Sequence, residues 1–435
     1  HGGLIFCDLR DREGITQLTF DPEHSDGDAF KIAETMRPEW PIKIHGVVRA
    51  RGEETTNTKL ATGEIEVLTD HAEVLNTSVT PPFQIEDGIE TSEDTRLRYR
   101  YLDLRRPEMM ANLKLRSDFT FAIREALHNR EFMEVETPVL SPIAGGANAR
   151  PFITHHNTLD IDMYMRIATE LHLKRLIVGG LERVYEVGRI FRNEGMDTKH
   201  NPEFTTCELY QAFTNLDGMM DILEGILAGA AKEILGTYQL QWLGHDIDLT
   251  PSWKRVTMAD AVKEVTGADF MAIEGDNDAA VALAKSVGVD MDGVDKTWGN
   301  ALYETFDQKV EETLIQPTFI TMYPVEVSPL AKRSPSDPHL TERYEMFVCG
   351  CEMGNAFTEL NDPMDQYERF KAQVEKRANG DDEAEMMDED YVMALEYGLP
   401  PTGGLGFGID RCAMMLCGTD SIRDVILFPT MKPQS

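Results

Sequence analysis

Long hydrophobic runs are absent from this sequence of 435 residues. A membrane-spanning helix needs about 20 consecutive apolar residues, and no stretch approaches that length. No basic and then apolar leader opens the chain, as a secretory signal would. We therefore expect neither a membrane span nor secretion.

Cysteine is also scarce, with six residues in the chain. They form no C-x-x-C, and none has a histidine at zinc-ligand spacing, which argues against a zinc site and a disulfide scaffold. We expect free thiols in a reducing cytoplasm. Cys349 and Cys351 are close enough in sequence to hold a metal together, but packing within a strand is the simpler interpretation.

Basic residues are outnumbered, because 42 Lys and Arg stand against 76 Asp and Glu and give a formal charge of −34. Such acidity argues against nucleic-acid binding over the whole surface, but it does not exclude a nucleic-acid partner at a local basic patch. With 42% hydrophobic and 27% charged residues, the composition is that of a globular protein. The length predicts two or three units.

Short strand-like runs separated by polar turns fill the N-terminal part. We expect strands over 4–9, 15–20, 42–50 and 64–75, and one short helix over 29–36. This pattern predicts a small β-barrel, for which the OB-fold is the obvious candidate, over residues 1–82. Pro81-Pro82 then ends regular structure, and residues 83–110 are interpreted as a linker. Because the chain begins at His1, without Met and inside a strand-like run, we expect the first barrel strand to be missing.

The remainder, residues 111–435, mixes helical and strand-like patterns and predicts an α+β domain. Apolar residues at helical spacing indicate a helix around 115–127, followed by a strand over 132–136 that Pro138 stops. Further strands are expected over 184–191, 205–213, 318–325 and 344–360. Helices at 219–235, 258–265 and 279–286 predict a helical insertion around 216–300. Seven acidic residues in 380–390 predict a solvated segment.

Two arginine motifs are ambiguous when each is considered alone. Arg192 and Glu194 lie two residues apart, so a strand would point both the same way, toward a phosphate and an exocyclic amine. A surface ion pair of little value is the alternative. Near the C-terminus, Gly403–Gly408 is followed by Arg411 but by no P-loop Lys-Ser or Lys-Thr. These glycines permit close approach of a ligand, with Arg411 as a second phosphate clamp, or a tight strand-to-helix packing.

An acidic face is predicted where two strands carry polar side chains on alternate positions. Asn355, Phe357 and Glu359 alternate on one strand, and Glu208 and Tyr210 do so on another. A face this polar is unsuited to the core, since unpaired buried carboxylates are expensive. It would attract a metal ion or an ammonium group. Glu345 and Glu352 are candidates to hold Mg²⁺ on a nucleotide, and a solvated acidic face is the alternative.

Several segments together resemble the class II aminoacyl-tRNA synthetases of the lysine, aspartate and asparagine subgroup. They are RLRYRYLDLRRP at 96–107, FRNE at 191–194, NPEFT at 201–205 and GGLGFGIDR at 403–411, and Pro138 stands where the first motif carries its dimer-interface proline. From Ala144 onwards, AGGANARPF, ATELHLKRLIVGG, ELYQAF and NAFTELNDP are similar to the lysyl members. The resemblance covers nearly the whole chain in the right order. It implies a class II catalytic domain behind an OB-fold anticodon-binding domain, and a lysine–tRNA ligase that uses ATP, L-lysine, Mg²⁺ and tRNA(Lys) in the cytoplasm as a homodimer.

The resemblance also implies residue roles, which are carried over by position. The ATP-binding residues would be Arg192, Glu194, His200, Phe204, Glu345 and Arg411, with Arg192 and Arg411 as the catalytic pair. Phe204 would stack on adenine, and Glu194 would contact its amino group. Glu345 and Glu352 would ligate Mg²⁺. The lysine would lie among Gly146, Glu170, Glu208, Tyr210, Asn355, Phe357 and Glu359.

The N-terminal barrel is more similar to that of bacterial aspartyl-tRNA synthetases. The lysine and aspartate anticodons share a central uridine, and Phe6 and Gln17 match the positions that stack on it and read it. An aspartate–tRNA ligase, a ligase that lysylates a translation factor and a non-catalytic RNA-binding or regulatory paralogue are the alternatives. An aspartate carboxylate is ill placed beside Glu170, Glu208 and Glu359, the translation-factor ligases lack the barrel, and the retained motif arginines argue against a dead paralogue.

Overall fold

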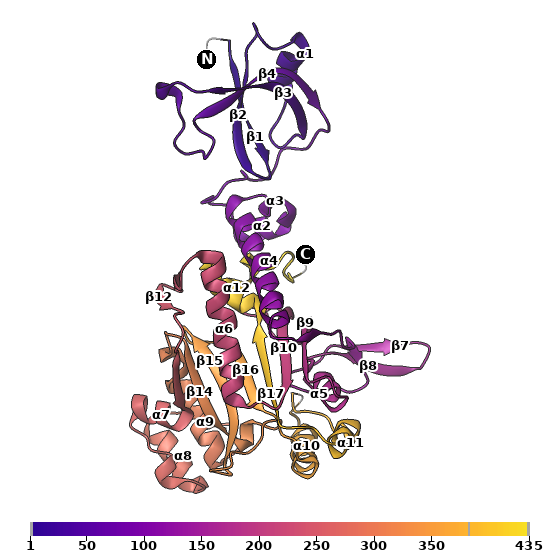
Figure 1. The fold of residues 1–435 in the computed structure, drawn as a ribbon, viewed down its shortest axis with the longest axis vertical. Coiled ribbons are helices and arrows are strands. Elements are labelled where there is room, and N and C mark those ends of the chain that lie inside the picture. Colours follow the sequence, from indigo (N-terminus) through magenta and orange to yellow (C-terminus); the bar gives the residue numbers. More distant parts are fainter. Residues whose placement is uncertain (1–2, 382, 433–435) are drawn as a thin grey trace. The chain divides into compact units, whose positions relative to one another are not determined.

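The computed structural model describes residues 3–381 and 383–432. The chain divides into two compact units, His1–Arg106 and Pro107–Ser435, each with its own hydrophobic core (Figure 1). No helix in the described part is long and apolar enough to cross a membrane.

Unit 1 is built on a four-stranded sheet in the order β1-β2-β4-β3. Its elements are β1 (Ile5–Asp11), β2 (Gly14–Phe20), α1 (Gly27–Thr35), β3 (Ile42–Ala50) and β4 (Ile65–Val74), which confirms the predicted strands and helix. Leu18, Phe20, Ala29, Ala33 and Ala72 form its core. The segment expected to be a linker carries two short helices, α2 (Glu93–Arg98) and α3 (Arg100–Asp103). They are held by fully buried Asp103, which pairs with Arg100 and Arg106 at 2.7 and 3.1 Å.

Unit 2 is organised around an eight-stranded sheet, which confirms the α+β class. Its order is β13 (Lys254–Thr257), β14 (Thr318–Pro324), β15 (Leu340–Val348), β16 (Cys351–Thr358), β17 (Thr402–Gly408), β10 (Glu203–Ala212), β9 (Arg183–Phe191) and β5 (Met133–Glu134). Neighbours are antiparallel except for β13 with β14 and β5 with β9. The strand expected over 132–136 is shorter than predicted, because only Met133 and Glu134 pair with β9.

Helices cover this sheet in three groups (Figure 1). The largest core lies under α4 (Pro107–His128), α6 (Leu216–Leu235) and α12 (Ile409–Cys417). A second core joins α7 (Met258–Thr266), α8 (Asn277–Ser286) and α9 (Trp298–Lys309), and a third joins α5 (Glu170–Val178), α10 (Pro363–Ala378) and α11 (Glu389–Glu396). Two small sheets complete the unit: β6 (Leu140–Ser141), β8 (Ile161–Met165) and β7 (Ile153–His156), and the hairpin β11 (Gln239–Trp242) with β12 (His245–Asp248).

The acidic segment between α10 and α11 differs from expectation. We predicted it to be solvated, which is wrong for Glu385 and Asp388, whose exposed fractions are 2% and 6%. Asp388 pairs with Arg175 at 2.8 Å and caps α11 by accepting from the Tyr391 amide. The segment is therefore tied into the protein by its own acids.

Candidate active site

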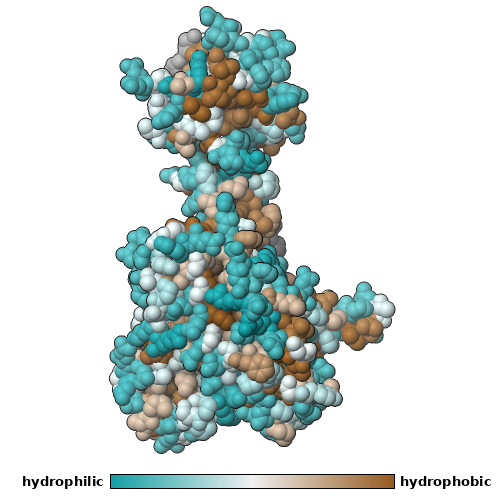
Figure 2. Space-filling view, viewed as in Figure 1, coloured by the Kyte–Doolittle hydropathy of each residue, from teal (hydrophilic) through white to brown (hydrophobic). Residues whose placement is uncertain are grey.

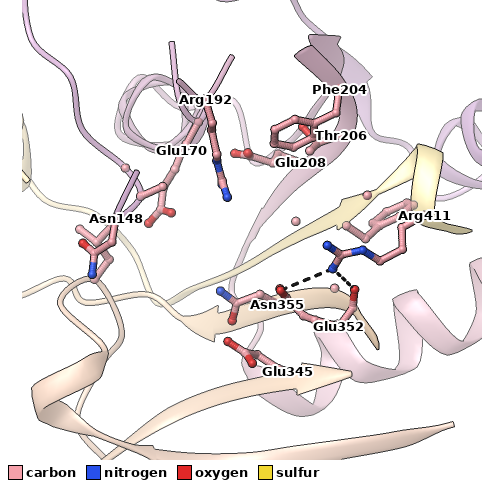
Figure 3. A pocket seen from close by; sticks show the side chains of 18 of the residues that line it. Asn148, Glu170, Arg192, Phe204, Thr206, Glu208, Glu345, Glu352, Asn355 and Arg411 are labelled. Carbon is pink, nitrogen blue, oxygen red and sulfur yellow. Dashed lines mark hydrogen bonds and ion pairs between the residues drawn. The ribbon is translucent and has the colours of Figure 1, made fainter. Parts of the chain in front are cut away.

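A cavity of about 610 Å³ opens on the sheet of unit 2. Strands β10, β15, β16 and β17 contribute lining residues, as do the loop around Gly146 and the loop that follows β9. The lining brings together nearly all the catalytic-domain residues singled out from sequence: Gly146, Glu170, Arg192, Glu194, His200, Phe204, Glu208, Tyr210, Glu345, Glu352, Asn355, Phe357 and Arg411. Figure 3 shows Arg192 pointing into the space between Glu170 and Glu208, with Glu345, Asn355 and Glu352 opposite.

One wall of the cavity comes from β10. Strand alternation puts Phe204, Thr206, Glu208 and Tyr210 on the same face. Glu208 accepts a hydrogen bond of 2.7 Å from the Thr169 hydroxyl, but burial raises its pKa to about 7. The positive charge and hydrogen-bond donors around this carboxyl do not fully offset its burial, so an incoming cation would stabilise its ionised form.

The facing wall comes from the β15–β16 pair, and a bulge shapes it. Phe347 pairs with Glu352 and Met346 with Gly354, so Met353 is an extra residue on β16. The bulge brings Glu352 to the same cavity as Asn355, although the two are three positions apart in the sequence. Glu345 lies opposite Asn355 and accepts from Tyr323 at 2.9 Å. Burial, together with the Glu352 charge, raises the pKa of Glu345 against the opposing effect of Arg343.

The glycine-rich strand β17 forms the floor between β16 and β10. A Cβ on Gly404 would overlap the Glu359 carboxylate and the Tyr210 ring, and one on Gly406 would lie 3.3 Å from Glu208 Cγ. These glycines therefore make room for the acidic and aromatic side chains of the neighbouring strands.

Two arginines face the cavity from different elements. The Arg192 guanidinium lies 5.3 Å from the centre of the Phe204 ring, and its buried Nε has no hydrogen-bond partner among the described residues. Arg411 stands in the first turn of α12 and donates to the Glu352 carbonyl oxygen, with the Glu352 carboxylate 3.7 Å away. Such an arrangement offers two planar donors to an anion that enters the cavity.

Glu359 is the catalytic-domain residue that sequence analysis selected and that does not line the cavity. It is 1% exposed and lies 2.5 Å from the ammonium of Lys174, which also contacts Glu170. The Lys174 nitrogen is 6.0 Å from the centres of both the Tyr210 and the Tyr391 rings. Burial acts to lower the pKa of Lys174, but Glu170 and Glu359 outweigh it and raise that pKa. Lys174 is thus a fully buried cation held between Glu170, which lines the cavity, and Glu359, which does not.

Comparison with known protein families agrees with this geometry. Residues 92–432 match the family model described as tRNA synthetases class II (D, K and N), and residues 1–75 match the OB-fold nucleic acid binding domain. This chain is a class II tRNA synthetase. Among its relatives, the lysine–tRNA ligase of Thermoanaerobacter sp. (strain X514) is 50% identical over 440 residues, covering 100% of this chain and 85% of the relative. The lysine–tRNA ligase of Staphylococcus aureus (strain MW2) is 53% identical over 432 residues, covering 99% and 85%. That of Nostoc punctiforme (strain ATCC 29133 / PCC 73102) is 49% identical over 443 residues, covering 100% and 77%.

The two residues expected to read the anticodon lie in unit 1 of this synthetase and are not among the residues that line the cavity. Phe6 on β1 is 47% exposed, and Gln17 on β2 shares its sheet face, since Phe6 pairs with Thr19 and Asp8 pairs with Gln17. Gln17 donates to Glu66 at 2.9 Å and accepts from Arg51 at 3.0 Å. An exposed aromatic ring on which a base can stack is typical of a nucleic-acid face on an OB-fold.

Sequence analysis missed three site residues of this class II synthetase. Lys174 appeared only inside a matched segment, Glu385 was assigned to a solvated stretch, and Asp410 was not considered. Asp410 accepts from Arg116 at 2.6 Å and from the Thr205 amide at 2.7 Å, so it fixes α12 against α4 and β10. Glu170 and Lys174 are four positions apart on α5, and this spacing, at which a helix forms ion pairs, was the one signal in the sequence that could have identified Lys174. The cysteines behave as predicted: Cys351 is buried in the core, and Cys349 is partly buried against it.

Proposed function

We propose that this synthetase is a lysine–tRNA ligase, which activates L-lysine with ATP and transfers it to the 3′ end of tRNA(Lys). The observation that carries the proposal is a group of carboxylates at one end of the cavity, namely buried Glu170 and Glu359 and half-buried Glu208, of which Glu170 and Glu359 share the Lys174 ammonium. A lysine brings two ammonium groups to such a place. The name shared by the relatives at 49–53% identity supports the same substrate.

Aspartate is disfavoured by the same charges. Its side-chain carboxylate would approach Glu170 and Glu208. Lys174 is already shared by Glu170 and Glu359, and Arg192, which points between Glu170 and Glu208, is the group that would hold the α-carboxylate of the substrate. Like charges in a buried site repel strongly. The aspartate–tRNA ligase alternative therefore has little support in the catalytic unit.

The other end of the cavity fits ATP. Arg192 and Arg411 are placed to bind phosphate oxygens, with His200 nearby, and Phe204 offers a ring for adenine stacking beside Glu194. Glu345 and Glu352 provide oxygen ligands for Mg²⁺, which characteristically binds one or two carboxylates together with substrate phosphates. The excess of negative charge there, which together with burial raises the pKa of neighbouring Glu311 to about 7, fits a divalent cation. When bound, Mg²⁺ would neutralise charge on the phosphates.

We infer a mechanism of positioning and charge stabilisation. The carboxylates and Asn355 hold the amino acid by its ammonium groups, with Gly146, Tyr210 and Phe357 around its body, and Glu359 acts from behind through Lys174. Arg192 lies between this end and Phe204, so it can hold the lysine carboxylate near the α-phosphate for in-line attack. Arg411 stabilises charge on the departing pyrophosphate. The adenylate then reacts with the tRNA 3′ end.

We further propose that the synthetase acts as a homodimer, with residues 116–138 at or near the two-fold interface. Exposed apolar side chains support this: Phe121 on α4 is 64% exposed, and Met133 on β5 is 53% exposed. Figure 2 also shows hydrophobic residues at the projecting β7–β8 hairpin, where Ile153 and Leu159 are 65% and 61% exposed. An active monomer in light scattering at working concentration would contradict this assembly.

The substrate is tested by ATP–pyrophosphate exchange with each of the twenty amino acids in turn. We expect exchange with lysine at the lowest concentration. Preference for aspartate would support the rival ligase, and the absence of exchange with every amino acid would support a non-catalytic paralogue.

A further inference from the structure

The segment that joins α10 to α11 contributes a side chain to the amino-acid end of the cavity. Ala384 and Glu385 are 3% and 2% exposed, and the Arg377 guanidinium donates to the Ala384 carbonyl at 3.0 Å. Met386 packs against the small core formed by Ala144, Ala149 and Ile167. These contacts press the segment against the loop that carries Gly146.

The Glu385 carboxylate lies inside this packing and lines the cavity. Neither of its oxygens has a hydrogen-bonding side chain among the described residues. Burial, together with the Glu170 charge, raises the pKa of Glu385 to about 8, while Lys174 and the Gly146 amide oppose the rise. A buried carboxylate without such a partner is costly unless a cation arrives.

At the amino-acid end of the cavity, acidic side chains outnumber basic ones. Glu170, Glu208, Glu359 and Glu385 lie around it. In the described part of the chain, Lys174 is the one cation that forms an ion pair with any of them, shared by Glu170 and Glu359, and Arg192 points between Glu170 and Glu208. Neither the sequence motifs nor the family match gave Glu385 a role. Its burial and its place in the cavity lining distinguish it from exposed Glu383, two positions earlier on the same segment, which does not line the cavity.

We propose that Glu385 is a specificity-determining residue that accepts a hydrogen bond from an ammonium group of the amino-acid substrate. This inference rests on the proposed lysine specificity and adds a contact from outside the sheet. The substrate ammonium would then stabilise the buried Glu385 carboxylate, and with it the packed position of the segment between α10 and α11.

The test compares the wild-type chain of 435 residues with Glu385→Gln and with Glu383→Gln, a control that removes the same charge from an exposed position. Glutamine keeps the shape of Glu385 and carries no buried charge, so folding is not expected to suffer. We expect Glu385→Gln to raise the KM for lysine in ATP–pyrophosphate exchange roughly 10- to 100-fold, the effect of one hydrogen bond to a charged group. Calorimetric binding of lysine should weaken to a similar extent, while the KM for ATP and the Glu383→Gln variant stay near wild type.

Competitive inhibitors identify which ammonium is bound. Norleucine retains only the α-ammonium, and 6-aminohexanoate retains only the distal one. Glu385→Gln should weaken inhibition by one of these compounds and not by the other. If neither inhibition constant changes, or if the KM for lysine is unchanged, the contact is refuted. Failure of the wild-type chain to activate lysine would instead refute the proposed function, so the two failures are distinguishable.

Discussion

At the scale of single residues, the amino-acid end of the cavity is dominated by charge. Lys174 is fully buried and is held between Glu170 and Glu359, under the rings of Tyr210 and Tyr391. The same group of carboxylates that binds the Lys174 ammonium can therefore also stabilise an ammonium group of a lysine substrate. Removing one member of such a buried pair leaves an uncompensated charge, which is far more costly than replacing the pair.

Glu359 is expected to affect lysine use through Lys174. In Glu359→Gln, the Lys174 ammonium loses one carboxylate and depends on Glu170 alone, which withdraws Glu170 from the substrate. We expect the kcat/KM for lysine in exchange to fall by a factor that corresponds to about 2–4 kcal/mol, the scale of a broken buried charge pair. The KM for ATP should change much less. Equal losses for both substrates would place the role of Glu359 outside the amino-acid pocket.

The pKa of Glu208 predicts a pH dependence. Burial raises it from 4.5 to about 7, so the folded protein holds a proton that the unfolded chain releases, and stability from this group falls as pH rises across that window. An ammonium that pairs with the ionised carboxylate relieves the penalty. Lysine should therefore raise the melting temperature more at pH 8 than at pH 6, and Glu208→Gln should reduce the difference. The same lysine-induced shift at both pH values in the wild-type protein would contradict this.

The sequence could predict most of these residues but not their pairing. Glu208 and Tyr210 were accessible because strand alternation is local and regular. Glu359 follows the end of β16, and its partner Lys174 comes from α5, so the contact depends on segments that meet only in the folded protein. Glu385 was mistaken for a solvated acid because its neighbours in sequence are acidic, whereas its burial is decided by packing against the Gly146 loop.

At the scale of elements, β17 contributes to the site because its glycines lack side chains and leave space in the cavity. It lies between β16 and β10, and its glycines leave space that neighbouring side chains occupy. The glycine run was visible in the sequence, and close approach was one of the interpretations considered. That the approaching groups are Glu359 and Tyr210 could be learned only from the strand register.

Gly404→Ala is expected to damage the amino-acid pocket. Its new Cβ would overlap the Glu359 carboxylate and the Tyr210 ring, so both must move. We expect a strong loss of lysine-dependent exchange together with a lower melting temperature, about 1–3 kcal/mol in stability for overpacking. Gly229→Ala on α6 is the matched control, because nothing lies within 4 Å of its new Cβ. The control should be neutral or slightly stabilised, and a similarly mild effect at Gly404 would show that the floor tolerates a side chain.

The bulge at Met353 illustrates what periodicity misses. A regular strand would place Glu352 and Asn355 on opposite faces, because they are an odd number of positions, three, apart. The extra residue reverses this and brings Glu352 beside Arg411 and near Glu345. Bulges are set by the pairing of two strands, so a one-dimensional pattern carries no signal for them.

For the molecule as a whole, the proposed activation of lysine belongs to unit 2 and the proposed anticodon contact belongs to unit 1. Every residue that lines the cavity belongs to unit 2, whereas Phe6 and Gln17 belong to unit 1, which has a separate core. Despite the net charge of −34, the barrel face with Phe6 carries Arg49 and Arg51 near Gln17 and Glu66. Asp8 and Glu66 share that face with the two arginines, so the exposed Phe6 ring, on which a base can stack, is the feature there that most favours nucleic-acid binding.

Phe6→Ala should therefore separate amino-acid activation from tRNA charging. The exposed ring offers a base about 1–3 kcal/mol of stacking, which corresponds to roughly a 5- to 150-fold rise in the KM for tRNA(Lys) when the ring is removed. Exchange with lysine and ATP should remain at the wild-type level, since the cavity lies wholly in unit 2. Val79→Ala, which truncates a 90% exposed side chain beyond β4, is the control and should charge tRNA normally. If Phe6→Ala charges tRNA with an unchanged KM, the ring does not contact the anticodon. If it also loses exchange, the catalytic unit depends on the barrel, and the two units do not act separately.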